Sequence, residues 1–137
     1  MPFSLELYKK NGFCLLENFL DKYESDNLMK YARKRLSSNK NNQSILEKKD
    51  NKGKVTLLSN WSTTLNNDVF SLIARDQRLV NLSKVVLGKS TYIYSHKVTM
   101  KNPLEGGAWE WHQDFGYWHD NGCLSPNMLS IWIAIDD

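Results

Sequence analysis

The chain has 137 residues, of which 41% are hydrophobic and 24% charged, and its formal net charge is +3. This composition is typical of one soluble globular domain or of part of a larger one. The sequence contains no apolar run near the ~20 residues of a membrane span. Its positive and negative charges are interspersed, which does not favour nucleic-acid binding. Because Cys14 and Cys123 indicate no disulfide framework and the N-terminus lacks the apolar segment of a secretory signal, we expect a cytoplasmic protein.

The first third of the chain predicts two helices with a short strand between them. Residues 4–13 predict a short helix that ends near Gly12, and "GFCLLENFL" predicts a brief strand. Asp21 and Glu24 have the spacing of a capping box at the start of a second helix. The apolar positions that follow at helical spacing, and that should face the core, are Leu28, Tyr31, Ala32 and Leu36.

The middle of the chain predicts a loop and two further helices. Residues 37–54 are polar, basic and rich in asparagine, which favours a long solvated loop, and residues 55–61 should be extended or irregular. Residues 66–88 indicate two helical pieces that are split near Asp76, with Gly88 as the C-terminal cap. We therefore expect residues 1–89 to form a helical N-terminal part.

From residue 90 onward the pattern favours strands. "STYIYSHKVTMKN" predicts a strand with Tyr92, Tyr94, Val98 and Met100 on one face and Ser95, Lys97 and Thr99 on the other. "EWHQDF" predicts a second strand, and "MLSIWIAIDD" predicts a central strand that is covered on both faces. The predicted fold class is α+β, with helices first and strands after them. Such a sheet needs more strands than these, so we expect residues 1–137 to be one partial domain, incomplete at its C-terminus.

The stretch "WEWHQDFGYWHDNG" contains a candidate metal pair. If "WHQDF" is extended, His112 and Asp114 project to the same face of the sheet and can bind one ion. An imidazole and a carboxylate are two of the three ligands in the facial triad of non-haem Fe(II) oxygenases. An HxD pair also occurs often by chance, so from these residues alone a polar pair at the end of a strand is the alternative interpretation.

The sequence resembles the phytanoyl-CoA dioxygenase family, in the branch that includes ectoine hydroxylase. The resemblance is carried by "SHKVTMKNPLEGGAWEWHQDFGYWHDNGCLSPNMLSIWIAIDD" and, near the start, by "NGFCLLENFL". It implies a double-stranded β-helix, or jelly roll. It also implies a dioxygenase that uses Fe(II), 2-oxoglutarate and dioxygen to hydroxylate a small organic substrate.

The resemblance also implies roles for individual residues. His112 and Asp114 match the first two iron ligands, and these are the expected metal-binding and catalytic residues. Lys97 and Thr99 match a strand that lines the barrel and contacts 2-oxoglutarate or substrate, and Trp118 matches an aromatic position beside the co-substrate pocket. On this basis the polar face of the Lys97 strand points into the active-site cavity, and its aromatic face packs on the N-terminal helices.

The family pattern further requires a later histidine and then an arginine that binds the distal carboxylate of 2-oxoglutarate. Neither follows Asp114 at the required place, and His96 comes too early in the chain. We therefore expect a chain without the complete facial triad. His96 alternates onto the apolar face and predicts a hydrogen-bonded core histidine. His119 predicts a local hydrogen bond, and residues 120–122 predict a turn.

Two other functions fit the sequence. A jelly-roll module could stack sugars on Trp109, Trp111, Tyr117 and Trp118, and such binding would not depend on His112. A non-catalytic fragment could instead associate with another chain through the open edge of its last strand, because exposed strand edges favour pairing.

Overall fold

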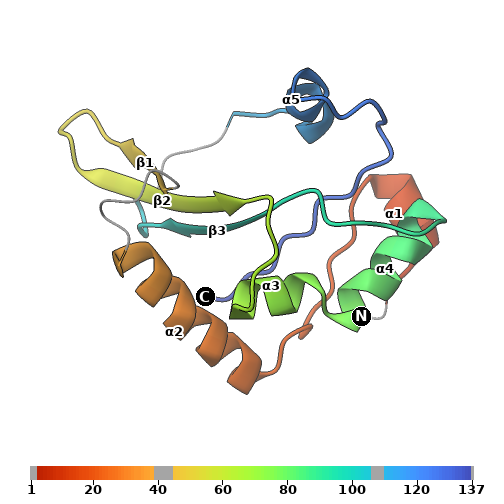
Figure 1. The fold of residues 1–137 in the computed structure, drawn as a ribbon, viewed down its shortest axis with the longest axis horizontal. Helices are drawn as coiled ribbons and strands as arrows, with labels where there is room; N and C mark the ends of the chain where they lie inside the picture. The colour runs from red at the N-terminus through yellow and green to blue at the C-terminus, as the bar shows by residue number, and fades with distance from the viewer. Residues whose placement is uncertain (1–2, 39–44, 106–109, 137) are drawn as a thin grey trace.

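The computed structural model describes residues 3–38, 45–105 and 110–136. Within these ranges a three-stranded sheet lies in the middle, with α2 and α3 on one face and α5 on the other, while α1 and α4 lie together at one end (Figure 1). The helices are α1 (Leu5–Asn11), α2 (Lys22–Ser38), α3 (Val69–Ala74), α4 (Gln77–Leu87) and α5 (Asp114–Asp120). The strands are β1 (Ile45–Lys49), β2 (Val55–Ser62) and β3 (His96–Lys101).

The helix ends predicted from capping residues are confirmed. Gly12 ends α1 with a left-handed φ of 79°, which favours glycine, and its N–H donates to the carbonyl of Tyr8. Asp21 and Glu24 exchange side-chain to backbone hydrogen bonds of 2.9 and 2.7 Å at the start of α2. Asp76 separates α3 from α4, and its carboxylate accepts from the N–H of Arg78.

The sheet is antiparallel, in the order β1-β2-β3. The strand β1 was not predicted, whereas β2 coincides with residues 55–61, which were expected to be extended or irregular. The expected loop at residues 37–54 is wrong over β1, and the expected helical character of residues 1–89 is wrong over β1 and β2. The strand β1 lies at an edge of the sheet and contains Glu47, Lys48 and Lys49. Charged residues on an edge strand prevent unwanted pairing, and they also make the strand resemble a solvated loop in the sequence.

Three predicted strands are absent from the described ranges. "GFCLLENFL" connects α1 to α2 without pairing, "EWHQDF" runs into α5, and "MLSIWIAIDD" carries no strand over residues 128–136. Each has the apolar or β-branched content of a strand, but a strand forms only where a neighbouring strand accepts its hydrogen bonds. The α+β class is thus observed. The jelly-roll topology remains an expectation from the family resemblance.

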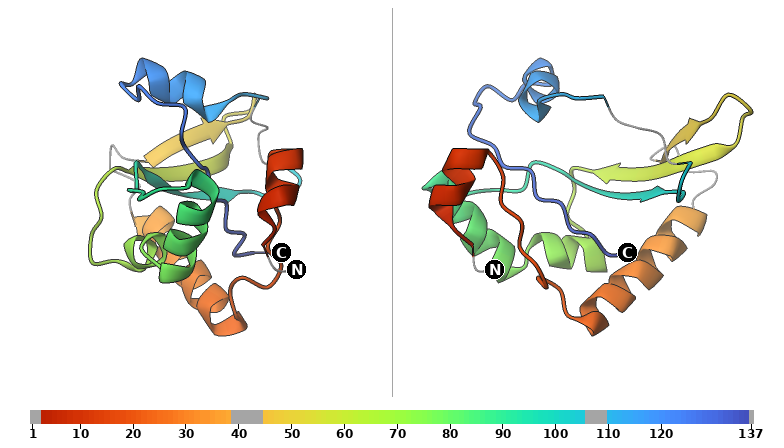
Figure 2. Two further views of the ribbon diagram at one scale, coloured as in Figure 1. Left: turned by 90° about the vertical axis from the view of Figure 1, so that its right-hand side faces the viewer. Right: turned by 180° about the vertical axis from the view of Figure 1, so that it is seen from behind.

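The main core lies between the sheet and the two helices below it. Val98 of β3 packs there with Leu28, Ala32 and Leu36 of α2 and with Phe70 of α3, and all five are less than 9% exposed. The predicted inward face of α2 is confirmed at three positions and wrong at Tyr31, which is 45% exposed. Ile135, from the C-terminal segment, packs against the same cluster. Figure 2 shows this segment passing from α5 on one side of the sheet to the helices on the other.

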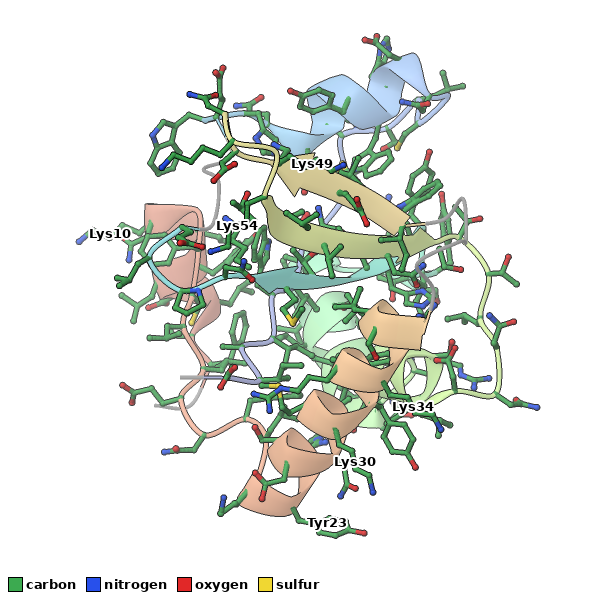
Figure 3. All side chains as sticks on the ribbon, turned by 90° about the vertical axis from the view of Figure 1, so that its left-hand side faces the viewer. Lys10, Tyr23, Lys30, Lys34, Lys49 and Lys54 are labelled. Carbon is green, nitrogen blue, oxygen red and sulfur yellow. The ribbon has the colours of Figure 1, made fainter. Side chains whose placement is uncertain are left out.

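Lysines on the described residues project from several elements. Lys30 and Lys34 project from α2, Lys49 and Lys54 from the β1–β2 hairpin, and Lys10 from α1 (Figure 3). Lys54 forms an ion pair of 2.6 Å with Glu105. None of the helices in the described ranges has the length and apolarity to cross a membrane.

His96 lies on the core face of β3 as predicted, but its expected hydrogen bond is absent. Among the described residues, neither ring nitrogen of His96 has a hydrogen-bond partner. Arg35 from α2 and Asp68, which caps α3, are the charged groups that act on it, and they form an ion pair with each other at 3.4 Å. Burial, together with the positive charge of Arg35, lowers the pKa of His96 below its usual value, and Asp68 opposes this effect.

This environment predicts a loss of stability in acid. The unfolded chain binds a proton on His96 near pH 6.5, whereas the folded chain does so only at lower pH, so stability is complete above about pH 6.5 and falls as the pH decreases below it. His96→Leu should therefore flatten the decline of the unfolding free energy between about pH 7 and 5, measured by urea denaturation. His119→Leu, at an exposed position, is the control. An unchanged pH profile in His96→Leu would contradict this role.

Candidate functional site

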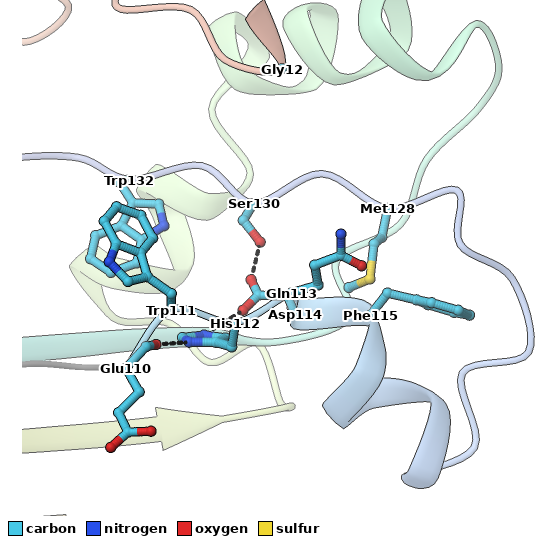
Figure 4. A pocket seen from close by; sticks show the side chains of 10 residues that line it. All are labelled: Gly12, Glu110, Trp111, His112, Gln113, Asp114, Phe115, Met128, Ser130 and Trp132. Atoms are coloured by element: carbon cyan, nitrogen blue, oxygen red, sulfur yellow. Dashed lines mark hydrogen bonds and ion pairs between the residues drawn. The ribbon is translucent and has the colours of Figure 1, made fainter.

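An open cleft of about 650 Å³ lies between the start of α5 and residues 128–132 (Figure 4). Five residues from 111–115 and three alternate residues from the C-terminal segment face each other across it. The residues that line it are Gly12, Glu110, Trp111, His112, Gln113, Asp114, Phe115, Met128, Ser130 and Trp132. The cleft therefore brings the candidate metal pair together with a segment that the sequence had assigned to a buried strand.

The imidazole of His112 is oriented by the backbone just before it. Its Nδ1 lies 2.6 Å from the carbonyl oxygen of Glu110, as Figure 4 shows, and the ring of Tyr117 packs edge-on at 5.3 Å between centroids. A carbonyl oxygen only accepts hydrogen bonds, so Nδ1 carries the proton. The lone pair of Nε2 in the neutral ring is then directed away from the backbone, which is how metal-binding histidines are commonly held.

Nε2 of His112 lies 3.3 Å from Oδ1 of Asp114. With a neutral imidazole, these two atoms are both electron-pair donors, and they repel each other unless a positive charge lies between them. That charge can be a proton or a metal ion. Metal–nitrogen and metal–oxygen bonds of about 2.1 Å at a right angle separate their donor atoms by about 3 Å, close to the observed spacing. The pair therefore fits the two adjacent ligand positions of a divalent metal.

Asp114 lies at the first position of α5 and is held from the opposite side by Ser130. The Ser130 hydroxyl donates a hydrogen bond to Oδ2 of Asp114, while Oδ1 faces His112. Ser130, Met128 and Trp132 were not predicted as site residues. Their alternation in the sequence was the available signal, because every second residue of an extended segment shares one face.

Trp118 lies outside the cleft lining and anchors α5 to the sheet. Its ring stacks on Trp61 of β2 with centroids 6.2 Å apart, and it meets the Tyr94 ring edge-on at 5.3 Å. These contacts fix the helix that begins with Asp114. The proposed place of Trp118 beside a co-substrate remains a prediction.

Lys97 and Thr99 occupy the face of β3 opposite to the core residue Val98. Thr99 shares a hydroxyl hydrogen bond of 2.9 Å with Ser59 of β2. The ammonium of Lys97 lies 5.8 Å from the ring centroid of Trp132, which lines the cleft. The structure thus links Lys97 to the cleft through Trp132, and it places Thr99 in the sheet, away from the residues that line the cleft.

No group of three His, Cys, Asp or Glu side chains converges within residues 3–38, 45–105 and 110–136. His119 lies 3.8 Å from Asp120 and meets the Phe115 ring edge-on, in agreement with a local role. The described part of the chain therefore supplies two candidate ligands.

Two described aromatic residues of the predicted sugar platform differ in their surroundings. Trp111 is fully exposed, whereas Trp118 is packed against the sheet, and Trp109 lies outside the described residues. The predicted association edge is also absent from the described residues, because residues 128–136 form no strand there.

Comparison with known proteins identifies relatives of this chain. The family model described as phytanoyl-CoA dioxygenase (PhyH) matches residues 8–137. L-proline trans-4-hydroxylase of Streptomyces griseoviridis is 42% identical over 52% of this chain and 27% of its own length. Ectoine dioxygenase of Bordetella bronchiseptica is 26% identical over 97% of the chain and 43% of its own length, and that of Halomonas elongata is 33% identical over 50% and 21%. The chain spans less than half the length of these relatives.

Proposed function

This chain belongs to the phytanoyl-CoA dioxygenase family, and on that basis we propose that it contributes the metal-binding His112 and Asp114 of an Fe(II)- and 2-oxoglutarate-dependent hydroxylase. The names of the related dioxygenases and of the proline hydroxylase support oxygenase chemistry. The observation that carries the proposal is the 3.3 Å approach of His112 Nε2 to Asp114 Oδ1 at an open cleft.

The roles of the two ligands follow from their surroundings. His112 binds as neutral imidazole through Nε2, because the Glu110 carbonyl retains the proton on Nδ1. Asp114 binds as carboxylate through Oδ1, because Ser130 occupies Oδ2. Fe(II) together with 2-oxoglutarate would supply the activation of dioxygen that leads to hydroxylation. The protein holds and orients the reactants of this chemistry.

The cleft also suggests how the reactants are held. The Lys97 ammonium lies near the cleft wall at Trp132, where it can attract the carboxylates of 2-oxoglutarate. Aromatic and thioether side chains from Trp111, Phe115 and Met128 supply apolar surface for a small organic substrate. The named relatives act on proline and ectoine, which favours an amino acid or a related small molecule as the substrate.

The proposed activity is tested with the longest gene product that contains these 137 residues. With Fe(II), 2-oxoglutarate, dioxygen and a candidate substrate such as L-proline or ectoine, it should form succinate, measured by mass spectrometry. Asp114→Ala should reduce the rate at least about 100-fold, because even outer-shell changes at metal sites cost about 10- to 100-fold. His119→Ala is the control and should retain the rate. Equal succinate formation by wild type and Asp114→Ala would contradict the proposal.

A further inference from the structure

We propose that Ser130 is a positioning residue that holds Asp114 in the orientation needed to bind a metal ion. This inference rests on the proposed function of the His112–Asp114 pair. The Ser130 hydroxyl donates to Oδ2 of Asp114 across the cleft, and Figure 4 shows the two side chains directed toward each other. Oδ1 is left facing Nε2 of His112.

Asp114 needs such a partner because little else restrains its side chain. It lies at the start of a seven-residue helix, and its side chain is 39% exposed. An exposed aspartate can turn about χ1 and χ2, and each turn moves Oδ1 away from His112. A hydrogen bond from a hydroxyl to an ionised carboxylate is stronger than one between neutral groups, and it favours one orientation.

Ser130 can impose an orientation because its own segment is fixed at a distance from the cleft. Ile135 packs against the main core, and the hydroxyl of Ser25 donates to its carbonyl at 3.3 Å. Closer to the cleft, the Lys97 ammonium makes a cation–π contact with Trp132, with Nζ 5.8 Å from the ring centroid. Since Trp118 attaches α5 to β2, the Ser130–Asp114 hydrogen bond joins two walls that are each anchored to the sheet or to the core.

A purely structural cross-link would have different consequences. If the hydrogen bond only stabilised the fold, removing it would lower stability and leave the Asp114 rotamer and the metal affinity unchanged. If Ser130 positions Asp114, the rotamer populations and the metal affinity change even where the stability does not. Ser130 is exposed, so threonine can retain the hydroxyl without crowding the segment.

The test compares Ser130→Ala, Ser130→Thr and, as the matched control on the same segment, Ser125→Ala. Co(II) affinity is measured by isothermal titration calorimetry, and three-bond couplings of the Asp114 side chain are measured by NMR without metal. Ser130→Ala should bind Co(II) about 10- to 100-fold more weakly than wild type. Its Asp114 side-chain couplings should take values averaged over several rotamers. Ser130→Thr should restore both properties, and Ser125→Ala should match wild type. Far-UV circular dichroism checks that each variant is folded.

The outcomes separate this inference from the proposed function. Unchanged affinity and couplings in Ser130→Ala, with binding that still depends on His112, would overturn the role of Ser130 alone. Co(II) binding that is insensitive to both His112→Ala and Ser130→Ala would overturn the metal site and this inference together. Loss of affinity in both Ser130→Ala and Ser130→Thr, without rotamer averaging, would also count against positioning through the hydroxyl.

Discussion

His112→Ala should weaken the binding of Co(II) to this chain by about 100-fold or more, because it removes one of two ligand atoms that face each other at 3.3 Å. Isothermal titration calorimetry at neutral pH measures the effect. His119→Ala is a matched control, since His119 is an exposed histidine of α5 that contacts Phe115 and lies near Asp120. His119→Ala should keep the Co(II) affinity within about twofold of the wild-type value, a much smaller change than the one expected on loss of a metal ligand.

The same titration has a predicted pH dependence. The imidazole and the carboxylate must both be free of protons to bind a metal, so the affinity of wild type should fall as the pH decreases. His112→Ala should show a weaker dependence. Equal loss of affinity in His112→Ala and His119→Ala would show that the metal binds elsewhere on the chain.

Leu36→Ala should lower the free energy of unfolding by about 2 to 5 kcal/mol, measured by urea denaturation. Leu36 is 2% exposed and lies in the cluster that joins α2 to Phe70 and Val98. Truncation removes apolar contacts and leaves a cavity that the neighbouring helices and strand fill only in part.

The matched control for Leu36 is Leu72→Ala on α3, where the leucine is 60% exposed. This substitution should change stability by no more than about 0.5 kcal/mol, as is usual for surface positions. Similar losses in the two variants would contradict the assignment of the core to the interface between the sheet and α2 with α3.

Local signals in the sequence predicted α1 to α4, whereas α5 lies where a strand and a loop were expected. Asp21 with Glu24, Asp76 and Gly88 each determine a helix end through hydrogen bonds to residues within four positions. Such interactions depend on nearby residues, so they can be recognised without the tertiary structure.

The strands were predicted less well because each depends on a distant partner. β1 pairs with β2 although its residues Glu47, Lys48 and Lys49 favour solvent, whereas the apolar "MLSIWIAIDD" pairs with no strand in the described part of the chain. Alternation of polar and apolar residues indicates what a strand would bury. It does not indicate whether another backbone lies beside it.

For the candidate site, the sequence predicted which residues pair, but it predicted the wrong secondary structure for them. His112 and Asp114 were expected on one face of a strand, and they are brought together instead where a short extended stretch enters α5. Ser130 was missed because its contact spans 16 residues and its segment was assigned to a buried strand. Trp118 was predicted to lie beside the co-substrate. In the structure its ring contacts Trp61 of β2 and Tyr94, which precedes β3.

The most direct test of the metal pair is paramagnetic broadening of the chain's NMR signals by substoichiometric Mn(II). The ion broadens the signals of nuclei near it, so the first residues affected mark where it binds. We predict that the signals of His112, Asp114 and Ser130 broaden first and that those of His119 and Asp120 persist to higher concentration. Initial broadening at Asp120 or at Glu47, with sharp signals at His112 and Asp114, would contradict the assignment of this pair as the metal site.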